Sequence, residues 1–189
     1  MKKIFFALLI LLTSTFLYAQ VDVAIPKGTE ILFDGFENGN YWIWAGFDWD
    51  QYGAHKISSG ANISMDWSSQ GRHSLELTME AITADSSKSA SWFYDGTNDL
   101  SGTRYLVVAF YNPENYTYNI TAVFQATDSW KWCQGPTYSI TPGQHTVVFD
   151  MSAFIDYTHD VRRITINMDN WEIYPKESHF YIDNIRIIK

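Results

Sequence analysis

The chain has 189 residues, in which 21 Asp and Glu outnumber 13 Lys and Arg for a formal net charge of −8 at pH 7. This acidic balance argues against a nucleic-acid partner, whose phosphates require a basic face, and equally against an anionic membrane surface. Aromatic residues make up 17% of the chain, including 8 Trp. Trp in excess of core needs tends to lie where a flat apolar partner stacks. We therefore expect a neutral ligand or a cation.

The N-terminus has the layout of a secretory signal peptide. Lys2 and Lys3 precede the apolar run Ile4–Leu12, and the small residue Ala19 stands before a predicted cleavage site. The run is short for a membrane span, which needs about 20 apolar residues, although a retained anchor is the alternative. The pattern is of the bacterial type and predicts a secreted or periplasmic protein without membrane insertion. We predict three segments: a signal peptide at 1–19, an N-terminal extension at 20–30, and one domain at 31–189.

Short segments with a period of two follow along the chain, and no long stretch has the 3.6-residue period of a helix. One helical turn is predicted within 151–160. On the last strand the alternation places Tyr181, Asp183, Ile185 and Ile187 on one side. Many short strands with turns between them predict an all-β fold, a two-sheet antiparallel β-sandwich of jelly-roll topology. The predicted strands are 31–36, 74–80, 90–94, 104–111, 118–127, 144–150, 162–168 and 180–188.

Paired aromatic residues suggest a surface for sugar rings. A pyranose presents C–H faces that stack on aromatic planes, and its hydroxyls bind amide, carboxylate and guanidinium groups. Trp130 and Trp132 share a face if that segment is extended, and Trp92 with Tyr94 forms a second pair. For any one of these rings, core packing is the alternative. The polar sides of the neighbouring predicted strands supply candidates for hydroxyl contacts, namely Gln125, Arg163, Asn167 and Asp169.

A further aromatic cluster, Trp42, Trp44 and Trp49, has two interpretations. The three rings either line a site at the rim of the sandwich or form a hydrophobic cap over one end.

Five motifs, in order, resemble jelly-roll carbohydrate-binding modules of the galactose-binding-like β-sandwich type. These modules commonly open with a turn of the pattern aromatic-acid-small residue-Phe-Glu, continue through a Gly-x-x-Ser-Leu strand, and close on a Tyr-Ile-Asp-Asn strand. The resemblance implies a non-catalytic protein that binds a polysaccharide on a concave sheet. The matching segments are 32–39, 69–75, 99–106, 142–152 and 180–187.

The resemblance also implies a structural calcium ion. Such modules hold calcium with the Glu of the opening turn and the Asp of the closing strand, which are Glu37 and Asp183 here. Carboxylates and loop carbonyls are the oxygen ligands that calcium requires. The alternative is that both carboxylates accept hydrogen bonds from loop N–H groups.

The sequence argues against an enzyme. No Gly-x-Ser-x-Gly elbow and no His-Glu-x-x-His spacing is present, and the acids are scattered. Two alternatives to a carbohydrate-binding module remain. One is a structural or assembly protein of the cell envelope or an extracellular filament, in which the Trp residues would form a protein interface. The weaker alternative is a glycoside hydrolase with two carboxylates brought together by the fold.

Overall fold

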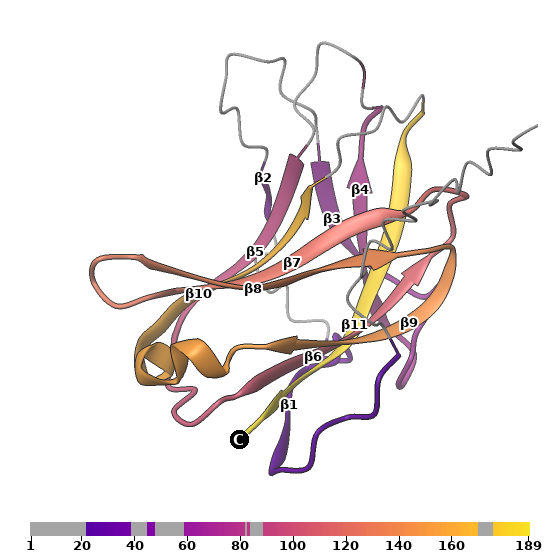
Figure 1. The fold of residues 1–189 in the computed structure, drawn as a ribbon. Helices are drawn as coiled ribbons and strands as arrows, with labels where there is room; N and C mark the ends of the chain where they lie inside the picture. Colours follow the sequence, from indigo (N-terminus) through magenta and orange to yellow (C-terminus); the bar gives the residue numbers. More distant parts are fainter. Residues whose placement is uncertain (1–21, 39–44, 48–58, 82, 84–88, 170–175) are drawn as a thin grey trace, which may run out of the picture.

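The computed structural model describes residues 22–38, 45–47, 59–81, 83, 89–169 and 176–189. Two antiparallel sheets pack face to face (Figure 1). Sheet A has the strand order β3-β4-β11-β6-β9, with β1 also paired to β11, and sheet B has the order β2-β5-β10-β7-β8. The elements are β1 Glu30–Asp34, β2 Ala45–Phe47, β3 Ser59–Ser64, β4 Ser74–Met79, β5 Ser89–Asn98, β6 Tyr105–Asn112, β7 Tyr118–Ala126, β8 Lys131–Ile140, β9 Gly143–Asp150, the 3-10 helix η1 Ser152–Asp160, β10 Val161–Asp169 and β11 Ser178–Ile188.

The predicted β-sandwich is confirmed. Each of the eight predicted strands and the helical turn is present, and the sequence pattern missed β2, β3 and β8. Alternation places one face of every long strand in the core, because successive side chains of a strand point to opposite sides. On β7 the core residues are Ile120, Ala122 and Phe124, and on β10 they are Ile164 and Ile166.

Aromatic rings join the two sheets across the core. Trp92 of sheet B meets Phe180 of sheet A edge to face, with ring centroids 4.9 Å apart and an interplanar angle of 84°. Tyr138 of sheet B meets Phe149 of sheet A in the same way, at 5.3 Å and 82°. Edge-to-face pairs add about 0.5–1.5 kcal/mol each beyond the burial of their area. These contacts fix how the sheets lie against each other.

The predicted facing of the last strand is wrong. Ile185 and Ile187 lie in the core, but Tyr181 and Asp183 point to the other side of sheet A. The register of β11 against β6 shifts between Asp183 and Arg186, and Asn184 has a φ of 49°. A bulge of this kind adds a residue to one strand and reverses the alternation beyond it.

The segment before β1 lies against the outer face of sheet A. Val23 packs on Val107 and Val148, which explains the nearly continuous apolar character of β6. The carboxylate of Asp22 accepts a 2.7 Å bond from the Thr146 amide. Residues from Asp22 onward therefore contribute to the domain that was predicted to begin at 31. Within the described residues, no helix is long and apolar enough to cross a membrane.

Candidate functional site

The outer face of sheet B, which points away from the core, gathers the predicted polar and aromatic residues into a row. Arg163 of β10 is paired with Gln125 of β7, and Gln125 is paired with Trp132 of β8. On its other side Arg163 is paired with Asp95 of β5. The sheet-B row is therefore Asp95, Arg163, Gln125 and Trp132, side by side on four adjacent strands. Neighbouring strands lie about 4.8 Å apart, so the row spans about 14 Å.

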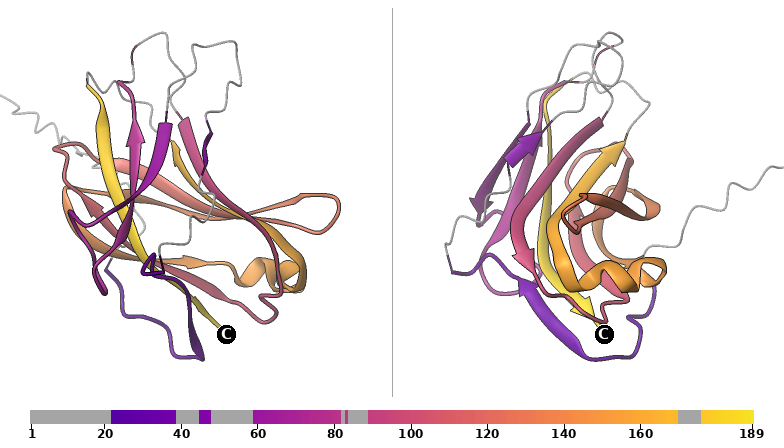
Figure 2. Two further views of the ribbon diagram at one scale, coloured as in Figure 1. Left: turned by 180° about the vertical axis from the view of Figure 1, so that it is seen from behind. Right: turned by 90° about the vertical axis from the view of Figure 1, so that its left-hand side faces the viewer.

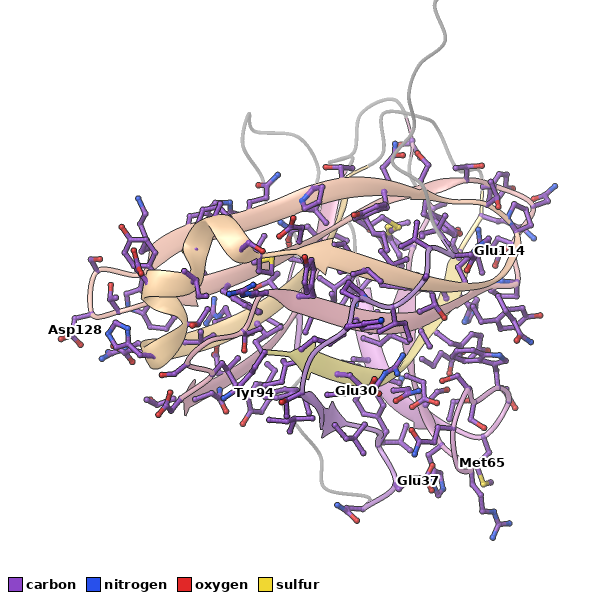
Figure 3. All side chains as sticks on the ribbon, turned by 60° about the horizontal axis from the view of Figure 1, so that its bottom comes forward. Glu30, Glu37, Met65, Tyr94, Glu114 and Asp128 are labelled. Carbon is purple, nitrogen blue, oxygen red and sulfur yellow. The ribbon has the colours of Figure 1, made fainter. Side chains whose placement is uncertain are left out.

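Trp130 and Trp132 present exposed rings at one end of this row. Their exposed fractions are 46% and 39%, whereas most of the large apolar side chains are buried. Trp132 donates a 3.0 Å hydrogen bond from Nε1 to Oε1 of Gln134. Trp130 lies in the turn of the β7–β8 hairpin with a φ of 54°. This hairpin extends beyond the body of the sandwich beside η1 (Figure 1), and Asp128 marks its tip in Figure 3.

Arg163 organises the centre of the row. Its Nε and Nη2 donate to the two carboxylate oxygens of Asp95, at 2.5 and 2.8 Å. The guanidinium carbon lies 4.0 Å from the ring centroid of Phe93 and 5.2 Å from that of Trp130. The planar group is thus held by one carboxylate and two rings, in a geometry that a lysine cannot reproduce. Because both oxygens of Asp95 are bonded to Arg163, this carboxylate is not free to act as a general acid or base.

A polar floor continues from the row along the same face of sheet B. Ser91 of β5 donates from Oγ to Oδ1 of Asn167 on β10 at 2.5 Å. The hydroxyls of Thr121 and Thr137, on β7 and β8, are 2.8 Å apart. Ser91, Thr121 and Asn167 are 2%, 1% and 8% exposed. This floor therefore supports the row from beneath and is not itself an open binding surface.

The prediction for Trp92 and Tyr94 is wrong. The two do share a face of β5, but it is the inner one: Trp92 is fully buried and Tyr94 is 9% exposed. The Nε1 of Trp92 donates to the carbonyl of Gly60 at 2.9 Å. The outer face of β5 instead carries Phe93 and Asp95, which the sequence analysis did not select. The sequence does contain a pointer to Asp95. It is the acidic residue of β5, and its partner Arg163 was predicted on the polar side of the neighbouring strand.

Two further predictions fall wholly or partly outside the described residues. Only the backbone of Asp169 is described, and it ends β10 opposite Ser89. Trp42, Trp44 and Trp49 belong to segments that lie outside the described part of the chain.

The predicted calcium ligands hold a loop of the chain. Oε1 of Glu37 accepts bonds from the amides of Arg72 and His73 at 2.6 and 2.7 Å. Oδ2 of the fully buried Asp183 accepts bonds from the amides of Ser69 and Gln70 at 2.8 and 2.9 Å. Both carboxylates thus act as the alternative interpretation expects. The His73 and Arg72 amides lower the pKa of Glu37. Both oxygens of Glu37 thus have hydrogen-bonding partners in the loop, and its role as a calcium ligand stays a prediction.

Buried oxygen atoms beside Asp183 do fit a cation. Oδ2 of Asp34 and Oδ1 of Asn184 are buried and have no hydrogen-bond donor. Burial raises the pKa of Asp34. The hydrogen bonds from the Phe36 and Gly35 amides lower it by less, and the nearby charge of Asp183 raises it further. Among the described residues, no three acidic, His or Cys side chains are arranged to hold a metal ion, so calcium held here would take carbonyl and water oxygens as well. Calcium bound there would neutralise two buried carboxylates; it remains a proposal.

Comparison with known proteins gives the fold a context. No family model matches the sequence, and no curated protein matches it. Among solved structures, the chain is similar to a β-sandwich carbohydrate-binding module from a study of promiscuous specificity (TM-score 0.65, 14% identity, 84% of this chain and 62% of that one). It is also similar to a non-crystalline cellulose specific module, CBM28 (TM-score 0.59, 21% identity, 87% and 97%). A third is CBM27-1 of Caldicellulosiruptor saccharolyticus in complex with mannohexaose (TM-score 0.58, 15% identity, 86% and 98%).

The fold is the jelly-roll β-sandwich of carbohydrate-binding modules. At these identities the likeness concerns the fold. The chain spans 62% of the first of these structures and nearly all of the other two. The residues of the site have to be judged by their own geometry.

Proposed function

We propose that this protein is an exported, non-catalytic carbohydrate-binding module that grips a polysaccharide on the outer face of sheet B. The observation that carries the proposal is the sheet-B row, in which Trp132 lies beside Gln125 and the adjacent ring of Trp130 contacts the fixed guanidinium of Arg163. Flat apolar rings beside amide and guanidinium donors complement a sugar, which has an apolar C–H face and a hydroxyl edge. Similar folds in complex with saccharides support the same class of ligand.

Binding without catalysis agrees with the charges on this face. A glycoside hydrolase needs two carboxylates flanking one bond, about 5–9 Å apart. Asp95 has both oxygens committed to Arg163. The test is to incubate the protein with polysaccharide and measure new reducing ends. Their release above the level of a buffer blank would overturn the non-catalytic part of the proposal.

Affinity electrophoresis of the domain from Gln20 onward tests binding itself. The gels contain hydroxyethyl cellulose or a soluble mannan, chosen because similar modules bind cellulose and mannohexaose. We expect retardation by one of them, and a clear reduction of that retardation in Trp130→Ala and Trp132→Ala. Leu32→Ala is the control, because this apolar side chain is 52% exposed but lies on β1 of sheet A. No retardation by any glycan, together with an oligomer in solution, would favour the assembly protein instead.

A further inference from the structure

The opposite face of the molecule carries a second row. On the outer face of sheet A, cross-strand pairing aligns one residue from each of the five strands β9, β6, β11, β4 and β3. The side chains point away from the core, so they share one surface. This sheet-A row is Gln144, Tyr111, Tyr181, Glu76 and Asn62. At about 4.8 Å per strand it spans about 19 Å, the length of a few linked sugar rings.

Aromatic rings form the middle of the sheet-A row. Tyr111 stacks on Tyr181, with centroids 5.8 Å apart and an interplanar angle of 26°. Trp67, from the loop after β3, stacks on Tyr111 at 5.6 Å and 29°. The backbone of Trp67 is held by a 2.6 Å bond from Oγ of Ser74 to its carbonyl oxygen. Trp67 and Tyr111 are both partly exposed, so the group presents ring surface that is already fixed in position.

Hydrogen-bonding groups flank the rings on both sides. Glu76 accepts a bond from the hydroxyl of Tyr181 at 3.3 Å and lies 2.9 Å from Nδ1 of His179. Burial and then the charge of Glu76 raise the pKa of Tyr181 to about 12, so its hydroxyl keeps the proton that it donates. Asn62 and Gln144 are exposed at the two ends. The row thus combines two amides, a carboxylate and stacked rings.

The remainder of this face is already covered by the chain itself. Val107, Val148 and Ile188 are buried under the segment that contains Val23. The exposed half carries alternating rings and polar groups. It is therefore more polar than the centre of a stable protein interface, which is mostly apolar. The carboxylates of Glu76 and Asp66 both act on Tyr181 and make the region electronegative, which disfavours a sulfated or uronic polymer.

We propose that the outer face of sheet A is a second binding site for a neutral saccharide, centred on Trp67 and Tyr111. It rests on the proposed function and extends it from sheet B to the outer face of the other sheet of the sandwich (Figure 2). The two sites are separated by the core, so each binds a different segment of polymer. One molecule then links two polysaccharide chains.

Affinity electrophoresis in hydroxyethyl cellulose and in a soluble mannan separates the two faces. A sheet-B variant carries Trp130→Ala and Trp132→Ala. A sheet-A variant carries Asn62→Ala and Gln144→Ala, which are exposed positions where truncation preserves the fold. Trp67→Ala is a second sheet-A variant, accepted only if its melting curve matches that of the wild type. Leu32→Ala again serves as the control, because β1 contributes no residue to either row.

We expect the sheet-B variant to keep a residual retardation, reduced two- to tenfold, which disappears when the sheet-A changes are added. Wild-type protein should also raise the viscosity of the polymer solution, and either variant alone should not. If the wild type is retarded but the sheet-B variant migrates freely, the second site is wrong and the proposed function stands. If the wild type is not retarded by either polymer, both fail. If Trp67→Ala changes the oligomeric state but not the retardation, the face is a protein contact and the proposal is overturned.

Discussion

Replacing Arg163 by lysine keeps the charge at the centre of the sheet-B row and removes its planar fork. The substitution loses one of the two bonds to Asp95 and the stacking on Phe93, whose centroid is 4.0 Å from the guanidinium carbon. At a partly exposed position, each of these contacts is worth roughly 0.5–1 kcal/mol. The expected loss is therefore about 1.5 kcal/mol, or about 3–6 °C in Tm for a domain of this size.

Arg162→Lys is the matched control for this prediction. Arg162 is the preceding residue and has its own fork, in which Nε and Nη2 donate to the two carboxylate oxygens of Asp160 at 3.2 and 3.3 Å. The contacts with Phe93 and Trp130 belong to Arg163, so the comparison isolates the contribution of the rings. Urea unfolding of both variants measures the difference. A Lys variant at 163 that is no less stable than the one at 162 would refute the argument that the rings fix this position.

Binding provides an independent check on the same residue. If Arg163 positions the ring of Trp130, Arg163→Lys and Trp130→Ala should not be additive in glycan affinity. Residues in contact typically show coupling of about 0.5–3 kcal/mol in a double-mutant cycle. Additive losses would mean that the two side chains contact the glycan independently.

Three further predictions concern stability. Glu37 has a lowered pKa, so its carboxylate stabilises the fold above the ordinary value of 4.5 and loses that effect as the pH falls through the folded value. Glu37→Gln should thus lower Tm at pH 7 and match the wild type in acid; a gap that is constant with pH would contradict this. Millimolar calcium should raise Tm. A calcium concentration of a hundred times Kd would add about 2.7 kcal/mol to the free energy of unfolding. EDTA should reverse the rise, and Asp34→Asn should abolish it. If calcium does not change the Tm of the wild type, no cation binds at Asp34, and its buried carboxyl group is neutralised by protonation instead. Ile166→Ala, at a fully buried position, should cost about 2–5 kcal/mol in urea unfolding, and a cost near zero would mean that the core is misassigned.

Periodicity predicted most of the sheets because alternation is a property of the strand itself. It failed where neighbouring strands decide the outcome. The strand β8 was missed because Gly135 and Pro136 interrupt its pattern, and its register against β7 shifts at that point. The reversal in β11 depends on Asn184, whose positive φ cannot be recognised from alternation alone.

The candidate site was predictable in part. Trp130, Trp132, Gln125 and Arg163 were selected from spacing and chemistry, and the structure brings them together on one face. The prediction for β5 was wrong because both faces of this strand carry aromatic residues, so composition does not show which face lies in the core. Which residue lies beside Arg163 depends on the register of β5 against β10, and register arises only when the sheet forms.

The backbone conformation of the turn that carries Trp130 affects which residues stability favours at this position. A bulky residue at a φ of 54° costs about 1 kcal/mol relative to glycine, which adopts that conformation freely. Trp130→Gly relieves that cost but also removes the contact of the ring with Arg163, which is of similar size, so Tm should change little while a ring is lost from the site. Selection for thermal tolerance alone is then nearly indifferent to tryptophan at this position. A tryptophan retained there in related chains would reflect selection for the ring itself.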